Sequence, residues 1–314
     1  MSERLRVALL AGGTSGEREV SLKGAQGVIK ALSPERYEVT LYDPAQDLSR
    51  LVADAKNIDV AFILLHGPLG EDGTVQGFLD LLGIPYQGSG VLGSALAMNK
   101  QVAKTLYCHA GILVPDWRLI TNNDIQNPAG LTRRLIEQLG LPLIIKPVSQ
   151  GSSLGMSLIK RSEELLAGLE AALVFDHEVL VEQFISGREI TGGVLGNEDP
   201  IALPLVEIIP GETYTFFDYE AKYRPGASRE ICPAILSPPL TEKAKDYALK
   251  AHQTLHLRGY SRTDMMVREE EIFVLETNTI PGMTETSLLP QAAQAAGLSF
   301  SELLDRLIEL ALEP

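Results

Sequence analysis

Two β-rich runs within residues 261–278 carry four polar side chains at a spacing that suits a metal site. Three glutamates separate the runs, a pattern typical of a β-hairpin. With the turn centred on the middle glutamate, Asp264 faces Glu276 and Arg262 faces Asn278. Because side chains alternate along a strand, all four are expected on one face of the hairpin.

Carboxylates that face each other across two strands repel, so Asp264 and Glu276 need a cation between them. Oxygen donors from these two residues and the Asn278 amide suit Mg²⁺ or Mn²⁺ rather than zinc. A solvated polar face is the alternative for any single carboxylate, but four polar groups in register favour a metal site. The opposite face is apolar and typical of a core, with Met265, Val267, Phe273 and Leu275.

A lysine followed by a Gly- and Ser-rich loop indicates a second site. Lys146 ends an apolar strand and precedes the loop 150–155. Burying a lysine is costly unless it meets an anion, and such a loop can close over phosphates with N–H and hydroxyl donors. A surface hairpin is the alternative. The loop matches neither the Walker A motif nor the kinase Gly-rich loop.

Two further motifs are weaker. Residues 88–93 match G-x-G-x-x-G, but they follow a fourth strand and lack the strand-end acid of a dinucleotide site, so we expect a strand-to-helix turn. His252 and His256 are four residues apart, but Gln253 replaces the glutamate of HExxH and no third ligand is near. We expect a structural helix face there.

Two loops near the N-terminus predict a substrate site. The loop 11–21 joins the first strand to its helix, and the loop 66–73 follows the third strand at the same edge. Ligands of open α/β sheets bind at the carboxyl ends of strands, so Glu17 and His66 are expected to converge. The alternatives are a helix-capping partner for Glu17 and a satisfied loop residue for His66.

Strand and helix patterns alternate over the first 86 residues, which predicts a parallel α/β domain, and the later segments predict two α+β domains. We expect domains at 1–95, 96–186 and 187–314. The expected strands are 5–11, 37–42, 59–65, 84–86, 141–147, 156–160, 179–184, 190–195 and 203–209 besides the hairpin. The expected helices are 17–32, 47–55, 75–82, 91–109, 128–139, 162–172, 241–255 and 299–312.

The segment 210–239 contains five prolines and two glycines. Long structureless loops in compact domains are usually lids or disordered segments, and the aromatic residues here argue against disorder. We expect a lid that carries Lys222 and Tyr223 onto a reacting ligand.

Size and charge narrow the class of protein. The 314 residues, 45% of them hydrophobic, are enough for two or three domains with real cores. A net charge of −14 without a basic run argues against nucleic acid and anionic membranes as partners. Local lysines could still bind ATP. We expect no signal peptide and no membrane span. Cys108 and Cys232 are isolated, so we expect no disulfide framework and a cytoplasmic location.

The ordered motifs of the chain resemble those of the D-alanine–D-alanine ligases, which belong to the ATP-grasp superfamily. They are GGTSGEREVS, HGPLGEDG, KPVSQGSSLG, YEAKY, SRTD and ETNTIPGMTETSLL, between Gly12 and Leu289. The resemblance implies a three-domain ATP-grasp fold and an ADP-forming carbon–nitrogen ligase. Such an enzyme joins two D-alanines through an acyl phosphate for peptidoglycan precursor synthesis, and it is expected to be a homodimer.

The resemblance also implies residue roles around ATP, which would lie between the central and C-terminal domains. Lys100 and Lys146 would hold phosphates, and Glu182 would accept from the adenine amino group. Two Mg²⁺ ions, or Mn²⁺, would be held by Asp264, Glu276 and Asn278. The full set of expected ATP-binding residues is Lys100, Lys146, Ser153, Glu182, Phe184, Ile185, Glu189, Lys222 and Phe273.

Roles in D-alanine binding and catalysis follow from the same resemblance. Glu17 would bind the ammonium group of the first D-alanine, helped by Ser152 and His66. Tyr223 would complete a hydrogen-bonded triad with Glu17 and Ser152. Ser287 and Leu288 would place the second D-alanine. Arg262 and the Gly282 N–H would stabilise the tetrahedral oxyanion.

Three other functions are alternatives to this one. A D-alanine–D-lactate ligase is disfavoured by Tyr223, because such relatives differ there. A catalytically silent ATP-binding regulator would not need both the metal set and Arg262. A nicotinamide-dependent oxidoreductase rests only on the weak glycine motif at 88–93.

Overall fold

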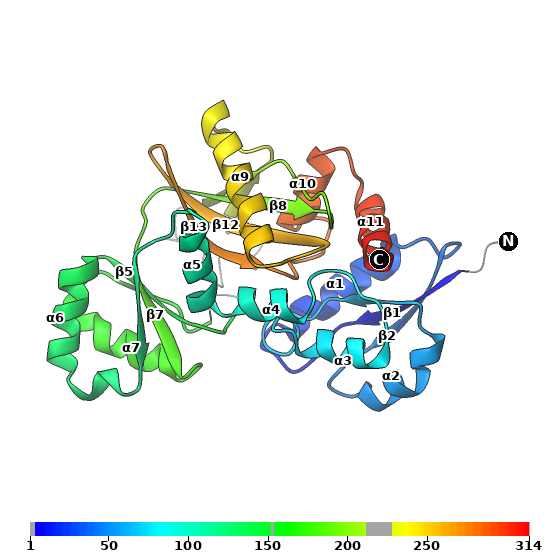
Figure 1. Ribbon diagram of the computed structural model, residues 1–314, viewed down its shortest axis with the longest axis horizontal. Coiled ribbons are helices and arrows are strands. Elements are labelled where there is room, and N and C mark those ends of the chain that lie inside the picture. Colours follow the sequence, from blue (N-terminus) through cyan, green and yellow to red (C-terminus); the bar gives the residue numbers. More distant parts are fainter. Residues whose placement is uncertain (1–3, 152–153, 212–227, 314) are drawn as a thin grey trace.

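The computed structural model describes residues 4–151, 154–211 and 228–313. Within these ranges, three sheets follow one another along the chain (Figure 1). The first is parallel and the other two are antiparallel, each with helices packed against it. The expected α/β class, with one parallel N-terminal sheet and two α+β units after it, is confirmed.

The first sheet is built on β1 (Leu5–Leu10), which lies between β2 (Tyr37–Tyr42) and β3 (Val60–Ile63). The strand expected at 84–86 is reduced to a single parallel bridge between Tyr86 and Ala61. The helices of this region are α1 (Arg18–Ala31), α2 (Leu48–Asp54) and α3 (Thr74–Leu82), with a 3₁₀ turn at Ala55–Asn57.

Two helices, α4 (Val91–Met98) and α5 (Lys100–His109), replace the single helix expected at 91–109. Asn99 separates them because its backbone is extended and its side chain accepts a hydrogen bond from the Val102 N–H. Asparagine is a favoured N-cap, so a helix start was encoded at this position. The break places Lys100 in the first turn of α5.

The second sheet has the order β4-β7-β5-β6, and α6 (Pro128–Leu139) and α7 (Leu165–Leu173) share one apolar cluster with it. Its strands are β4 (Trp117–Thr121), β5 (Leu143–Pro147), β6 (Ser157–Ile159) and β7 (Glu178–Gln183). The sequence patterns did not predict β4. Short 3₁₀ turns occur at Asp124–Gln126 and Ser162–Glu164.

The third sheet has the order β11-β10-β8-β12-β13, with β9 paired to β8, and α9 (Pro238–Thr254) packs against it. Its strands are β8 (Arg188–Leu195), β9 (Ile201–Ala202), β10 (Val206–Pro210), β11 (Ser228–Ile231), β12 (Tyr260–Arg268) and β13 (Glu271–Asn278). Both β11 and the start of α9 fall inside the loop expected at 210–239. The expectation of an irregular segment is therefore wrong for these parts.

The C-terminal helices tie the third sheet to the first. After α10 (Leu288–Ala295), which was not expected, α11 (Phe300–Leu312) packs against α1 and β3 (Figure 1). One hydrophobic cluster contains both Leu9 of β1 and Leu307 of α11. The end of the chain therefore helps to hold the first sheet in place.

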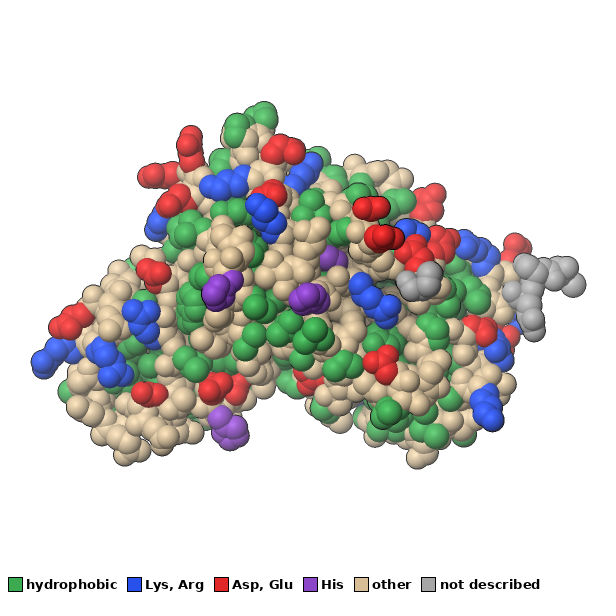
Figure 2. Space-filling view, in the orientation of Figure 1, with side chains coloured by type: hydrophobic (Ala, Val, Ile, Leu, Met, Phe, Trp, Pro, Cys, Tyr) green, Lys and Arg blue, Asp and Glu red, His purple; other side chains and the backbone are tan. Residues whose placement is uncertain are grey.

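Charged side chains of both signs are interspersed on the face shown in Figure 2, and acidic groups project at the tip of the β12–β13 hairpin, where Glu269 to Glu271 are exposed. Among the described residues, no helix is both long and apolar enough to cross a membrane.

Candidate active site

The β12–β13 hairpin has the predicted register at its polar end. Asp264 pairs with Glu276 and Arg262 pairs with Asn278. The turn itself differs from the prediction, because Arg268 pairs with Glu271 and the turn therefore has two residues rather than three. A bulge beyond Asp264 compensates for this shift, so the polar pairs remain opposite each other.

The bulge changes which apolar side chains face the core. Met265 and Val267 belong to the cluster under α9, as predicted, but their partners there are Ile272 and Val274. Phe273 and Leu275 were predicted on the same face as Met265, which is wrong, although Phe273 is buried. Phe273 pairs with Met266, which lines a cavity with Leu275, and the Arg268 guanidinium lies 4.8 Å from the Phe273 ring centre.

That cavity has a volume of about 510 Å³ and lies between the second and third sheets. Its wall combines apolar side chains with charged groups from several elements. The expected ATP-binding and metal residues among its lining are Lys100, Lys146, Glu182, Phe184, Ile185, Glu189, Asp264 and Glu276. Phe273 and Asn278 are not part of this lining.

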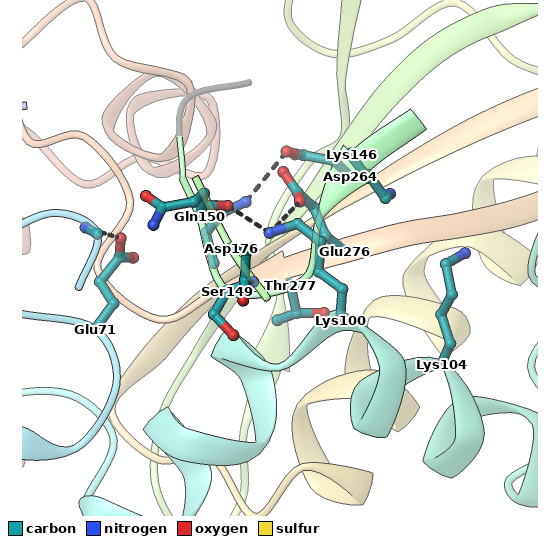
Figure 3. A network of polar contacts seen from close by, with 12 residues as sticks. Glu71, Lys100, Lys104, Lys146, Ser149, Gln150, Asp176, Asp264, Glu276 and Thr277 are labelled. Atoms are coloured by element: carbon teal, nitrogen blue, oxygen red, sulfur yellow. Dashed lines mark hydrogen bonds and ion pairs between the residues drawn. The ribbon is translucent and has the colours of Figure 1, made fainter. Parts of the chain in front are cut away.

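Two lysines bring positive charge to the cavity. The Lys100 ammonium donates to the Gln150 carbonyl at 2.6 Å and lies 3.6 Å from Glu276 Oε2 (Figure 3). The Lys146 ammonium lies 3.0 Å from Glu182 Oε1. Both side chains are largely buried, and a buried ammonium group favours an anionic ligand.

Side-chain cations already compensate the two carboxylates that face each other. Arg262 donates to both Asp264 oxygens, at 2.9 and 2.8 Å, and Lys100 pairs with Glu276. Asn278 Nδ2 donates to Asp264 Oδ2 at 3.1 Å, which leaves its amide oxygen as a possible ligand. Within the described ranges, no three His, Cys, Asp or Glu side chains cluster as a metal site.

The donor set nevertheless fits magnesium. Mg²⁺ usually takes only one or two carboxylates from the protein and completes its shell with water and substrate phosphates. Two carboxylates and an amide oxygen beside a cavity with two lysines match that requirement.

Glu17 and His66 come together at the end of the first sheet, as predicted. Glu17 is buried, and its Oε2 lies so close to two glycines that a Cβ at Gly67 would come within 3.0 Å and one at Gly151 within 2.7 Å. His66 Nδ1 bonds to the Ile280 carbonyl at 3.0 Å. Burial lowers the pKa of His66, while the nearby Glu17 charge acts in the opposite direction.

The residues expected around the second substrate are also neighbours. A Cβ at Gly282 would lie 3.1 Å from Ser287 Oγ, which accepts from the Thr284 N–H at 3.1 Å. Ser287 is the N-cap of α10. The Leu288 side chain packs in the cluster under the first sheet, so it contributes chiefly to the core.

Four expected site residues lie outside the described residues: Ser152, Ser153, Lys222 and Tyr223. The described neighbours Gly151 and Leu154 both line the cavity.

Sequence reasoning missed two charged groups, the partly buried Glu71 and the buried Lys104. Glu71 accepts from the Gly67 and Ile280 N–H groups, and removal from water, reinforced by the Glu17 charge, raises its pKa to about 8. Lys104 lies one helical turn after Lys100 and pairs with Glu182. The available signals were the place of Glu71 in the HGPLGEDG motif and the i, i+4 spacing of the lysines.

The weaker motifs have structural roles. Gly88 has a φ of 84° beside the Tyr260 ring, and Gly90 precedes α4, so this glycine motif forms the predicted strand-to-helix turn. His252 is buried and its Nδ1 bonds to Ser261 Oγ at 2.8 Å.

Comparison with known proteins identifies the family and the fold. The family model "D-ala D-ala ligase C-terminus" matches residues 106–309, and "D-ala D-ala ligase N-terminus" matches residues 44–89. The chain is 61% identical to the D-alanine–D-alanine ligase of Desulfotalea psychrophila, covering 99% of this chain and 96% of that one. It is 60% identical to the ligase of Syntrophobacter fumaroxidans, covering 99% of each.

Solved structures agree with this similarity. The D-alanine–D-alanine ligase of Bacillus anthracis, complexed with ATP, superposes with a TM-score of 0.84 at 36% identity, covering 98% of this chain and 97% of that one. The VanG D-Ala:D-Ser ligase of Enterococcus faecalis superposes with a TM-score of 0.83 at 32% identity, covering 99% of this chain and 100% of that one.

Proposed function

This chain belongs to the D-alanine–D-alanine ligase family, and we propose that it joins two D-alanines with ATP to form D-alanyl-D-alanine, ADP and phosphate for peptidoglycan precursor synthesis. The observation that carries the assignment to this cavity is that Lys100 and Lys146 line it together with the paired carboxylates Asp264 and Glu276. Phosphates and divalent cations are the groups that such a wall accommodates.

We place ATP in the cavity between the second and third sheets. The adenine would lie beside Phe184 and Ile185, with its amino group donating to Glu182, and Glu189 would hold the ribose. Lys100 and Lys146 would bind the phosphates. All six residues line the same cavity, which supports this placement. Ser153 and Lys222 are proposed to close on the γ-phosphate, and Phe273 to support the pocket from beside Met266.

Asp264, Glu276 and Asn278 would hold two Mg²⁺ ions, or Mn²⁺, with the nucleotide. Such ions, when bound, neutralise phosphate charge and favour displacement at phosphorus. Because Lys100 already contacts Glu276, this lysine connects the carboxylate pair with the phosphate-binding wall.

The reaction has two steps, and the chain contributes mainly positioning and charge. A carboxylate oxygen of the first D-alanine attacks the γ-phosphorus, the bond to the ADP oxygen breaks, and an acyl phosphate forms. The amine of the second D-alanine then attacks the acyl carbon, loses a proton and displaces phosphate. Correct placement of the reacting groups supplies much of the rate in such reactions.

We propose the substrate contacts from the family resemblance, supported for the described residues by where they lie. Glu17, buried beside Gly67 and Gly151, binds the first ammonium group with help from His66 and Ser152. Ser287 and Leu288 position the second D-alanine. Arg262 and the Gly282 N–H stabilise the tetrahedral oxyanion, and Tyr223 joins Glu17 and Ser152 in a hydrogen-bonded triad. The part of the segment 210–239 that carries Lys222 and Tyr223 would act as the lid over these groups.

We further propose a cytoplasmic homodimer with domains at 1–95, 96–186 and 187–314. Each of the three sheets falls within one of these ranges, and α11 returns to the first. Cys108 and Cys232 are both free thiols, which fits a reducing compartment.

Product formation tests the function. The enzyme, ATP and Mg²⁺ are incubated with D-alanine, L-alanine, or D-alanine together with D-lactate or D-serine, while phosphate release and product mass are measured. D-Alanyl-D-alanine with one phosphate per product is expected. Nucleotide binding without any ligation would instead favour a silent regulator, and a depsipeptide or a D-alanyl-D-serine product would change the second substrate.

A further inference from the structure

Lys104 is a fully buried lysine that belongs to none of the roles above. Its side chain is 1% exposed, and its ammonium lies 3.3 Å from Glu182 Oε1 and 5.7 Å from the centre of the Trp117 ring. Trp117 is the cross-strand neighbour of Glu182, because β4 pairs with β7. Helix α5 therefore inserts a cation behind the carboxylate that faces the cavity.

Glu182 is shared by two ammonium groups. Lys146 lies 3.0 Å from the same Oε1 atom, and both Lys146 and Glu182 line the cavity, whereas Lys104 does not. Neither Lys104 Nζ nor Glu182 Oε1 has a well-directed hydrogen bond among the described residues. Lys104 can therefore reach a ligand only through Glu182.

Charge balance indicates what completes this cluster. Two ammonium groups against one carboxylate leave an excess of positive charge in a buried place, which is costly without an anion. A phosphate chain in the cavity would draw Lys146 away from Glu182. Lys104 would then remain as the partner of Glu182 in a one-to-one ion pair. Burial lowers the pKa of Lys104 to about 8, while Glu182 acts in the opposite direction, so the ammonium form persists near neutral pH.

We propose that Lys104 is a positioning residue that holds the Glu182 carboxylate in place, so that the site selects nucleotides whose purine carries a 6-amino group. This inference rests on the placement of the base beside Glu182 under the proposed function. An ionised carboxylate only accepts hydrogen bonds. It therefore accepts from the amino group of adenine and repels the O6 atom of a 6-oxopurine.

Loss of the Lys104 cation should weaken this discrimination in two ways. Without the Lys104 cation, the Glu182 carboxylate is held less firmly in its orientation toward the base, because only Lys146 remains to pair with it. Glu182 would also retain Lys146, which would then be less available to the phosphates. The variant Lys104→Met keeps the volume of the side chain and removes only the charge, and cores often tolerate such replacements of buried ions.

The test is the ratio of the dissociation constants of IDP and ADP, measured by calorimetry with Mg²⁺ and without D-alanine. The wild type should prefer ADP, and Lys104→Met should lower that preference roughly tenfold, about the effect of one hydrogen bond to a charged group. Glu182→Gln should lower it similarly, and the double variant should lose little more because both changes act on one contact. Tyr107→Phe, another buried polar change on α5 that does not touch Glu182, is the matched control and should keep the wild-type ratio.

An unchanged ratio in Lys104→Met, or additive losses in the double variant, would overturn the proposal and leave Lys104 a structural residue. If thermal unfolding shows that Lys104→Met does not fold, the ratio of the IDP and ADP dissociation constants is measured for Lys104→Gln instead. The binding assay contains no D-alanine, so it is independent of ligation. A wild type that binds ADP selectively but makes no dipeptide would contradict the proposed function and not the role of Lys104.

Discussion

Glu71 Oε1 accepts a hydrogen bond of 3.1 Å from the backbone N–H of Ile280, although 209 residues separate them in the chain. Its other oxygen accepts from the Gly67 N–H at 2.8 Å, and His66 Nδ1 bonds to the Ile280 carbonyl at 3.0 Å. Both polar groups of Ile280 are thus held by the loop after β3. This loop carries a proposed first-substrate residue, and the segment it holds leads to Gly282.

Replacement of Glu71 by Gln should change how stability depends on pH. A carboxyl whose pKa is raised from 4.5 to about 8 on folding contributes stability below pH 4.5, and this contribution is lost as pH rises through about 8. The wild type should therefore lose thermal stability relative to Glu71→Gln between about pH 5 and pH 8. Thermal unfolding across this range measures the difference.

The exposed residue Glu35 provides the control for that experiment, because Glu35→Gln removes a carboxyl that lies in solvent. Its unfolding profile should run parallel to that of the wild type. Parallel profiles for Glu71→Gln as well would show that Glu71 titrates alike in the folded and unfolded chain, contrary to the raised pKa.

The Glu276→Gln variant should lose turnover by about 100-fold or more at limiting Mg²⁺ while remaining folded. The change removes one charge from a proposed metal ligand, and even outer-shell partners of a metal contribute up to roughly 100-fold. Initial rates over a range of Mg²⁺ concentrations, with thermal unfolding as a check on the fold, provide the measurement. Glu271→Gln, at the exposed end of the same strand, should leave the rates unchanged. Wild-type rates in Glu276→Gln would remove Glu276 from the metal set.

The β12–β13 hairpin shows which features of a fold local sequence patterns predict and which they do not. Alternation gave the pairing of Asp264 with Glu276 correctly. It could not reveal the bulge, because an unpaired Leu275 leaves no mark in a run of apolar residues. The predicted register is therefore correct at the Asp264–Glu276 end of the hairpin, while Phe273 and Leu275 were assigned to the wrong face.

The elements that the sequence patterns did not predict are those that depend on tertiary contacts. The short strand β4 contains Arg118 between its apolar residues and is fixed by its pairing with β7. Strand β11 is held by β10 although it lies in a proline-rich segment. Lys104 and Glu71 could not be predicted because a single charged residue in a helix or a loop gives no periodic signal. Only the fold shows the groups that each of them contacts.

The Tyr223→Phe variant should retain ATP hydrolysis and accept D-lactate as second substrate. The prediction rests on the resemblance, which places the Tyr223 hydroxyl against Glu17 and Ser152, and loss of the hydroxyl would loosen that contact. Product analysis by mass spectrometry, with D-alanine and D-lactate in competition over a range of pH values, measures the outcome. Exclusive formation of the dipeptide at every pH would remove Tyr223 as the specificity residue.

The Gly151→Ala variant should impair use of D-alanine without unfolding the protein. A Cβ at position 151 would lie 2.7 Å from Glu17 Oε2, and the two next nearest atoms would lie at 3.7 Å. The end of the Glu17 side chain can move aside at little cost to stability, but it then leaves the place proposed for binding the first ammonium group. Loss of a hydrogen bond to a charged group costs about 1.5–3 kcal/mol, so the KM for D-alanine should rise roughly 10- to 100-fold.

Gly27→Ala is the matched control, because a Cβ at Gly27 on α1 would meet no atom within 4 Å. Alanine is favoured over glycine inside a helix by about 1 kcal/mol, so this variant should be slightly more stable and equally active. Initial rates against D-alanine concentration at saturating ATP, together with ADP dissociation constants, separate the two effects. Gly151→Ala should raise KM for D-alanine by a larger factor than it raises the ADP dissociation constant, although Gly151 also lines the ATP cavity. A wild-type KM in Gly151→Ala would show that the position of the Glu17 carboxylate does not determine D-alanine binding.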